Sequence, residues 1–137
     1  MNSLFDSYGE EVQFLVVYIA EAHALDGSWP NSQESAPLVE EPISFEERYS
    51  IAGTCMASLA LQRLPAVVDG MDNAVNRNYQ AQPDRLYLIG KDGKIAYAGR
   101  RGPRGFKPLE LEHAIRKELE PPKPKVEAPA PEGSAQE

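Results

Sequence analysis

A carboxylate, an imidazole and a second carboxylate follow one another at Glu21, His23 and Asp26. Imidazole serves as a general acid or base near neutral pH, and a neighbouring carboxylate can orient it. The same three side chains could ligate a metal, but only the histidine is a good transition-metal ligand, so the metal reading is the weaker one. By themselves these residues leave two roles for His23 open, one catalytic and one purely structural, as a hydrogen-bonded histidine at a strand end.

An apolar segment at 14–20 would position these side chains. It is too short to span a bilayer and rich in β-branched and aromatic residues, so we predict a strand buried on both faces of a parallel sheet. Ligands and catalytic groups gather at the carboxyl ends of such strands. Tyr18, on this strand, fits either the core or a proton relay. Trp29 follows this strand and fits two roles, an anchor of the loop or one wall of an aromatic pocket.

The other segments predict an α/β fold, a mixed sheet flanked by helices, ending in an antiparallel hairpin and a C-terminal helix. Ser44 and Glu47 form a predicted capping box, and Asp92-Gly93 predicts a two-residue hairpin turn. Residues 1–120 form one predicted domain, and 121–137, rich in proline, glutamate and alanine, a disordered tail. The predicted elements are helix 2–8, strand 14–20, loop 27–42, helix 44–62, strand 65–69, short helix 72–79, strands 85–90 and 94–98, and helix 108–119.

Composition narrows the possible partners. The net charge of -7 over 137 residues disfavours nucleic acid, because phosphate binding requires clustered lysine and arginine. A single cysteine excludes an internal disulfide and favours the reducing cytoplasm. Cys55 lies on the apolar stripe of helix 44–62, where a thiol behaves as a small hydrophobe. No membrane span is expected in this chain, and an open sheet edge would permit a homodimer.

A basic, glycine-rich loop at 99–105 follows the predicted hairpin. Its arginines could simply keep the loop soluble. Arg101 is the best placed of them to bind an anionic ligand, since a guanidinium pairs with a carboxylate in bidentate fashion. Asp69 and Asp72 follow a strand and are predicted to cap backbone groups there.

Four segments resemble the iodothyronine deiodinases, thioredoxin-fold selenoenzymes that remove iodine from thyroid hormones. The resemblance spans residues 4 to 119 and implies a thioredoxin-like fold, in which Pro83 faces the active site. The Tyr-Ile-x-Glu-Ala-His-x-x-Asp-Gly and Met-Asp-Asn strings are its most specific parts. The four segments are 14–27 with Trp29, 67–73, 83–89 and 94–103.

This resemblance implies reductive deiodination of a small aromatic iodinated substrate by a selenol or thiol, with external thiols as reductant and no resident cofactor or metal. It makes His23 the proton donor, with Tyr18 and Asp84 in its relay. Arg101, Trp29 and Glu21 would bind the substrate. Asp84 stands where the family has glutamate and is one methylene shorter, so a relay through it is expected to include a water.

The family's selenocysteine or cysteine would precede Met1, and 40–45 lacks a second histidine that the family carries. We therefore expect the catalytic strand, which would lie between strands 12–20 and 84–90, to be encoded upstream. A UGA codon for selenocysteine read as a stop would explain the start at Met1. Two rival interpretations are a catalytically inactive thioredoxin-fold binding module and a peroxiredoxin-like thiol reductase.

Overall fold

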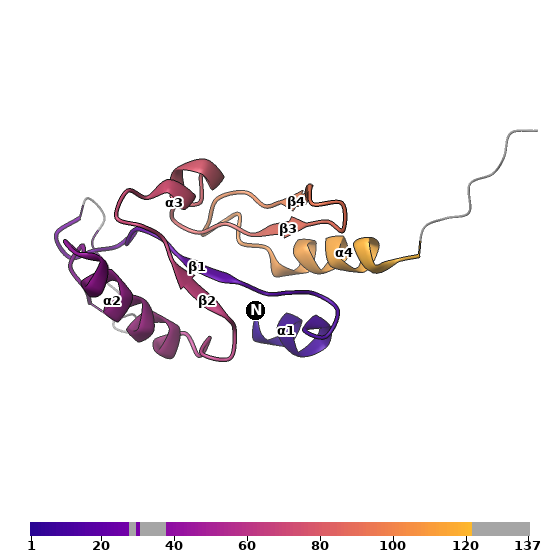
Figure 1. Cartoon of the computed structure of the whole chain (residues 1–137), viewed down its shortest axis with the longest axis horizontal. Helices are drawn as coiled ribbons and strands as arrows, with labels where there is room; N and C mark the ends of the chain where they lie inside the picture. Colours follow the sequence, from indigo (N-terminus) through magenta and orange to yellow (C-terminus); the bar gives the residue numbers. More distant parts are fainter. Residues whose placement is uncertain (28–29, 31–37, 122–137) are drawn as a thin grey trace, which may run out of the picture.

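The computed structural model describes residues 1–27, 30 and 38–121, so Trp29 and the predicted tail beyond Pro121 lie outside the described residues. The predicted α/β class is confirmed, and helices and strands alternate along the chain as far as β3, which β4 follows directly (Figure 1). In order they are α1 (Asn2–Tyr8), β1 (Val16–Tyr18), α2 (Phe45–Ser58), β2 (Ala66–Val68), α3 (Ala74–Tyr79), β3 (Tyr87–Ile89), β4 (Ile95–Ala98) and α4 (Pro108–Leu119).

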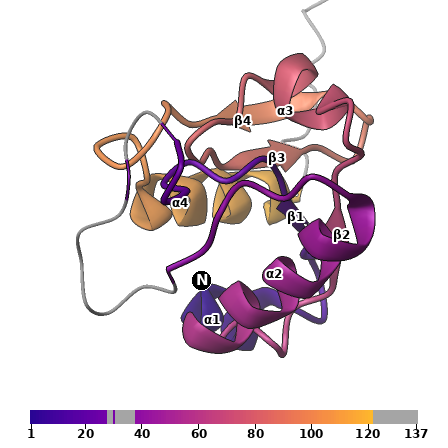
Figure 2. The same cartoon turned by 90° about the vertical axis from the view of Figure 1, so that its left-hand side faces the viewer.

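The strands form two separate two-stranded sheets among the described residues, where the sequence predicts one mixed sheet that lacks a strand between 12–20 and 84–90. β1 pairs with β2 in parallel, and β3 pairs with β4 in antiparallel fashion. Helix α4 lies along the β3–β4 pair, while α2 lies beside β2 (Figures 1 and 2). None of the described helices combines the length and the apolarity that crossing a membrane requires.

Burial of β1 on both faces was predicted and is wrong. Residues Val16 to Tyr18 are half-buried, and the neighbouring Leu15 is 57% exposed. The apolar sequence of strand 65–69 predicts a buried strand as well, and for β2 this is also wrong, since Val67 is 47% exposed. The physical reason is the same for both: in the described part of the chain these strands pair only with each other.

One apolar cluster nevertheless joins the two sheets. Its buried members come from α1, β3 and α4 and from the residues just before β1 and β2, and half-buried Val16 of β1 packs against them. The ring of Phe5 meets that of Phe14 edge to face at 5.6 Å between centroids. Full burial of such a side chain contributes about 1.5–3 kcal/mol, so this cluster is the main source of stability. The buried members are Leu4, Phe14, Leu64, Leu88, Leu111 and Ile115.

Helix α2 begins as predicted and ends early. The Ser44 hydroxyl accepts the backbone N–H of Glu47 at 3.2 Å, which confirms the cap, while the Glu47 carboxylate accepts the N–H of Ile43. The helix was expected to reach residue 62 but ends at Ser58. Ala60 adopts a φ of 54°, a left-handed conformation that no helix can continue through.

The hairpin between β3 and β4 differs from its prediction. Its turn closes from the Gly90 carbonyl to the Gly93 N–H at 2.9 Å, and Gly90 also donates to the Lys94 carbonyl. The loop is therefore the three residues Lys91, Asp92 and Gly93, not Asp-Gly alone. Gly93 has a φ of 77°, which suits glycine at the end of a three-residue hairpin loop.

Candidate functional site

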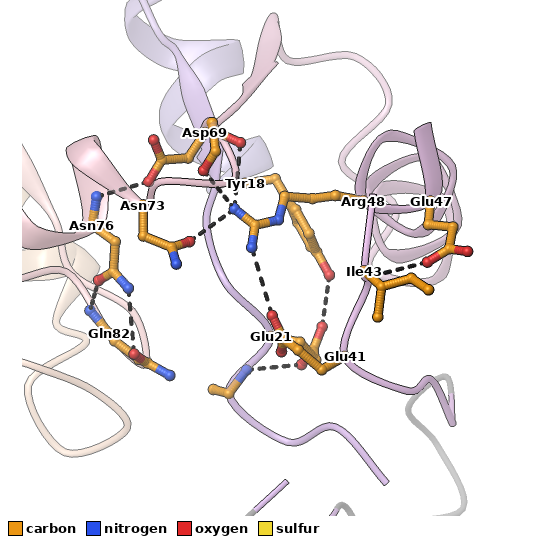
Figure 3. Close-up of polar contacts among 12 residues, drawn as sticks. Tyr18, Glu21, Glu41, Ile43, Glu47, Arg48, Asp69, Asn73, Asn76 and Gln82 are labelled. Carbon is orange, nitrogen blue, oxygen red and sulfur yellow. Dashed lines mark hydrogen bonds and ion pairs between the residues drawn. The ribbon is translucent and has the colours of Figure 1, made fainter. Parts of the chain in front are cut away.

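Tyr18 and Glu21 are joined directly at the end of β1 (Figure 3). The Tyr18 hydroxyl donates to Glu21 Oε2 at 2.6 Å. The other carboxylate oxygen accepts the backbone N–H groups of Ala22, at 3.1 Å, and of His23, at 3.3 Å. The Glu21 carboxylate thus stabilises the turn of the chain immediately after the strand, and it links the His23 backbone to the Tyr18 hydroxyl.

The proton of the Tyr18 hydroxyl is held firmly. Burial raises the pKa of Tyr18 far above its ordinary value, and the hydrogen bond and charge of Glu21 raise it further. The phenol therefore stays a hydrogen-bond donor throughout the physiological pH range. In a proton relay it could orient a carboxylate but could not itself serve as a base.

Cys55 approaches the same hydroxyl from helix α2. Its thiol donates weakly to the Tyr18 oxygen at 3.9 Å, and the side chain is half-buried. Burial raises the pKa of the Cys55 thiol and the charge of Glu21 raises it further, while the hydrogen bond with Tyr18 opposes the rise. Since the thiolate is the nucleophile, a thiol in this environment is a poor one.

His23 lies at the surface between half-buried Ala22 and buried Ala24, which is 2% exposed. Its position thus suits contact with a molecule arriving from solvent. In the parts of the chain that the structure describes, no three histidine, cysteine, aspartate or glutamate side chains are grouped as a metal site requires.

Arg48 is a member of this site that the sequence analysis did not single out. It is 1% exposed, and its Nη1 donates to the Gly70 carbonyl at 2.7 Å and to Asn73 Oδ1 at 2.8 Å (Figure 3). Its Nη2 lies 3.5 Å from Glu41 Oε1. The signal was present in the sequence, because Arg48 stands one turn before Ala52 on the inward face of α2, where a cation is out of place.

Asp69 organises the turn after β2. Its carboxylate is 3% exposed and accepts the backbone N–H groups of Val75, at 3.1 Å, and Asn76, at 2.9 Å. The predicted capping role of Asp69 is confirmed, and Asp72 caps the N–H of Ala74 at 3.4 Å. These bonds hold the start of α3 against the end of β2.

Asn76 carries this connection onward to the turn before β3. Its amide oxygen accepts the Gln82 N–H at 3.1 Å, and its amide nitrogen donates to Gln82 Oε1 at 3.3 Å. The next peptide bond, between Gln82 and Pro83, is cis. Polar contacts therefore run from the end of β1 through Arg48 to the residue pair that precedes Asp84.

Asp84 and Arg101 belong to a second part of the site, next to loop 99–105. The Asp84 carbonyl accepts the N–H of Gly102 at 2.9 Å, and Arg101 Nε donates to the Gln80 carbonyl at 3.0 Å. Burial raises the pKa of the Asp84 carboxyl, and its buried Oδ2 has no hydrogen-bond partner among the described residues. Arg101 is exposed.

Four of the sequence-predicted residues therefore lie in two groups: Tyr18 and Glu21 at the end of β1, Asp84 and Arg101 around the start of β3. His23 belongs with the first group through its backbone. The fold and this arrangement define an α/β domain with a bonded tyrosine–carboxylate pair at the end of β1. The chain belongs to the iodothyronine deiodinase family, whose family model matches residues 1–119.

Three relatives illustrate the similarity. The chain is 34% identical over 110 residues to the type I iodothyronine deiodinase of Xenopus laevis, covering 80% of this chain and 41% of the relative. It is 39% identical over 105 residues to the thyroxine 5-deiodinase of Sparus aurata, covering 76% and 37%. For the human thyroxine 5-deiodinase the identity is 37% over 108 residues, covering 79% and 34%. The chain thus spans less than half the length of each relative.

Proposed function

We propose that this chain is part of an iodothyronine deiodinase-like oxidoreductase that removes iodide reductively from an aromatic substrate. The family membership and the bonded Tyr18–Glu21 pair, which holds the His23 backbone at the end of β1, carry the proposal. The selenol or thiol nucleophile would come from a segment that these residues do not include. Cys55 does not replace it, because burial raises the pKa of its thiol.

The proposed reaction has two steps. A selenolate attacks iodine, so that a selenium–iodine bond forms and the carbon–iodine bond breaks, leaving its electron pair on the ring carbon. Protonated His23 supplies the proton that completes the carbon–hydrogen bond. Two external thiols then reduce the selenenyl iodide, which releases iodide and a proton and yields a disulfide and the free selenol.

The roles of the other side chains follow from their contacts. Glu21 accepts from Tyr18 and from the His23 backbone, so it would hold the His23 segment in place. Exposed Arg101 could pair with a carboxylate on the substrate. Asp84, whose pKa is raised by burial, would enter a relay through water.

We further propose a thioredoxin-like fold in which a catalytic strand lies between β1 and β3. Two observations support it. The two sheets contribute to one apolar cluster, yet β1 and β3 are not hydrogen-bonded to each other in the described part of the chain. Half-burial of β1 is what a strand would show when one of its two neighbours is missing.

The direct test is iodide release from an iodinated phenol in the presence of a dithiol. A form extended upstream to include the nucleophile should release iodide, and the 137-residue chain should not. In the extended form, His23→Asn should lower turnover by about 100-fold or more, the range typical of a lost general acid.

His113 offers a matched control, because the chain has two histidines and His113 is exposed on α4. His113→Asn should leave turnover unchanged. Iodide release by the 137-residue chain alone would contradict the proposed source of the nucleophile. Equal loss in both histidine variants would contradict the role of His23.

A second candidate is an inactive binding module that uses an open sheet edge. Exposed apolar side chains on three strands and beside β1 favour it, since unpaired strands invite pairing with another chain. They are Leu15, Val67, Ile89 and Ile95, between 47% and 57% exposed. An extended form that binds an iodinated phenol without releasing iodide would support this candidate.

A further inference from the structure

Arg48 is a charged side chain where the fold would accept an apolar one. It lies on the inward face of α2, one turn before buried Ala52, and is 1% exposed. Its Nε is buried without a hydrogen-bond partner among the described residues. An unpaired buried N–H is a cost, and replacing a buried ion pair by apolar side chains is often neutral or stabilising. Stability alone is therefore a poor explanation for this arginine.

The guanidinium holds together groups from different segments. Nη1 binds the Gly70 carbonyl and Asn73 Oδ1, both just past the end of β2, and lies 3.5 Å from the Asp69 carbonyl. Nη2 faces Glu41 Oε1 across 3.5 Å. A planar guanidinium can serve these directions at once, which a single ammonium cannot.

Glu41 in turn is attached to the segment 21–26 that carries His23. The Glu41 backbone N–H donates to Asp26 Oδ1 at 2.8 Å, and close by the Leu25 N–H donates to the Val39 carbonyl at 2.8 Å. Figure 3 shows Glu41 on the same side of Arg48 as Glu21, whose charge acts on it. Burial raises the pKa of Glu41, the Arg48 charge opposes that rise, and the charges of Glu21 and Asp26 add to it.

We propose that Arg48, through its ion pair with Glu41, is a positioning residue that fixes segment 21–26 against the end of β2. The negative charges of Glu21 and Asp26 act on the Glu41 carboxylate, and Arg48 is the cation that offsets part of this repulsion. Without it the 39–41 segment would separate from β2, and the His23 segment bonded to it would follow. The inference relies on the proposed function only in treating segment 21–26 as part of an active site.

The test is amide hydrogen exchange and NMR of the 137-residue chain carrying Arg48→Lys. Lysine keeps the charge but cannot reach Gly70, Asn73 and Glu41 together. The amides of Leu25 and Glu41 should exchange about tenfold faster, because their acceptors are no longer held in place. The imidazole signals of His23 should shift, while those of His113 on α4 stay unchanged.

Arg63→Lys is the matched control, since Arg63 forms an exposed pair with Asp6 at 2.6 Å. It should change neither histidine. If Arg48→Lys does not fold, Glu41→Gln decides, because the 39% exposed Glu41 side chain tolerates the change and glutamine weakens the same contact. It should accelerate exchange at Leu25 and Glu41 by a smaller factor.

Two results would overturn the proposal. One is a folded variant in which Leu25, position 41 and His23 behave as in the unaltered chain. The other is equal acceleration in the α4 amides, which would make Arg48 a general stabiliser of the fold. Neither readout involves iodide release, so a failure of the proposed chemistry leaves this test intact.

Discussion

Two buried regions of this molecule are held together by different forces. The cluster around Ile115 joins α1, β1, β3 and α4 by apolar contact, whereas the region around Arg48 joins the ends of β1 and β2 by hydrogen bonds and an ion pair. Apolar burial has no preferred direction, so its loss weakens the whole domain. Hydrogen bonds are directional, so one altered group displaces particular segments. The comparison teaches that stability and site geometry can depend on different residues.

Ile115→Ala should give the largest change in stability. The side chain is 1% exposed, and its truncation leaves a cavity in the core, at a cost of about 2–5 kcal/mol. Thermal unfolding measures the loss, and at a temperature where the variant is folded the His23 signals should match the unaltered chain. Leu109→Ala on the same helix is the control, since Leu109 is 72% exposed and its loss should be near zero.

Arg48→Met should lower the free energy of unfolding less than Ile115→Ala does, and should displace the His23 segment more. Methionine fills much of the space but leaves the Gly70 carbonyl and Asn73 Oδ1 without their donor, a loss of about 1–3 kcal/mol. Chemical denaturation gives the free energy of unfolding, and NMR reports on His23. If Arg48→Met lowered stability more than Ile115→Ala and left His23 unmoved, the proposed division between the two regions would be wrong.

Gly102→Ala should test the second part of the site. A Cβ at this position would overlap the Asp84 carboxylate, so that side chain must move, at about 1 kcal/mol. Gly53→Ala is the contrasting control. Gly53 lies within α2, and a Cβ added there would meet no other atom within 4 Å. Alanine at this position should therefore stabilise the helix by about 0.5–1 kcal/mol. Thermal unfolding of both variants should therefore shift in opposite directions.

Asp84→Asn should give the smallest effect, visible in the pH dependence of stability. Burial raises the pKa of Asp84 above its ordinary 3.8, so the folded state binds the proton more tightly than the unfolded chain. Its contribution to stability is therefore lost as the pH rises from about 3.8 through the higher folded-state pKa. Asparagine does not titrate, so the Asp84→Asn variant lacks this pH dependence. The melting temperatures of the variant and the unaltered chain should therefore diverge at pH values above the folded-state pKa of Asp84. Parallel curves would show that Asp84 is not desolvated.

Local parts of the fold were predictable because their contacts are short in sequence. The Ser44 cap involves Glu47 three residues on, and the Tyr18–Glu21 bond spans the same separation at the end of a strand. Helix α4 was predicted at its true bounds from the apolar spacing of Leu111 and Ile115. The early end of α2 was missed because nothing in its periodicity indicates that Ala60 adopts a positive φ.

The site was predictable only in part for a related reason. The sequence places Glu21, His23 and Asp26 just past a strand, and the resemblance to the deiodinases implies that His23 donates a proton. Arg48 carries no motif, and its significance lies in partners such as Gly70 and Asn73, which are 22 and 25 residues away. Only packing of α2 against the end of β2 brings them within hydrogen-bonding distance.

The amino-acid sequence by itself thus determined the α/β class, most of the helices and strands and the family, because these depend on side-chain type and near neighbours. The tertiary structure decided that the described strands form two sheets, that Asp84 packs against Gly102, and that a buried guanidinium ties the His23 segment to β2. Those features depend on which distant segments fill the same space, a choice made by the free energy of the whole chain and not by any segment alone.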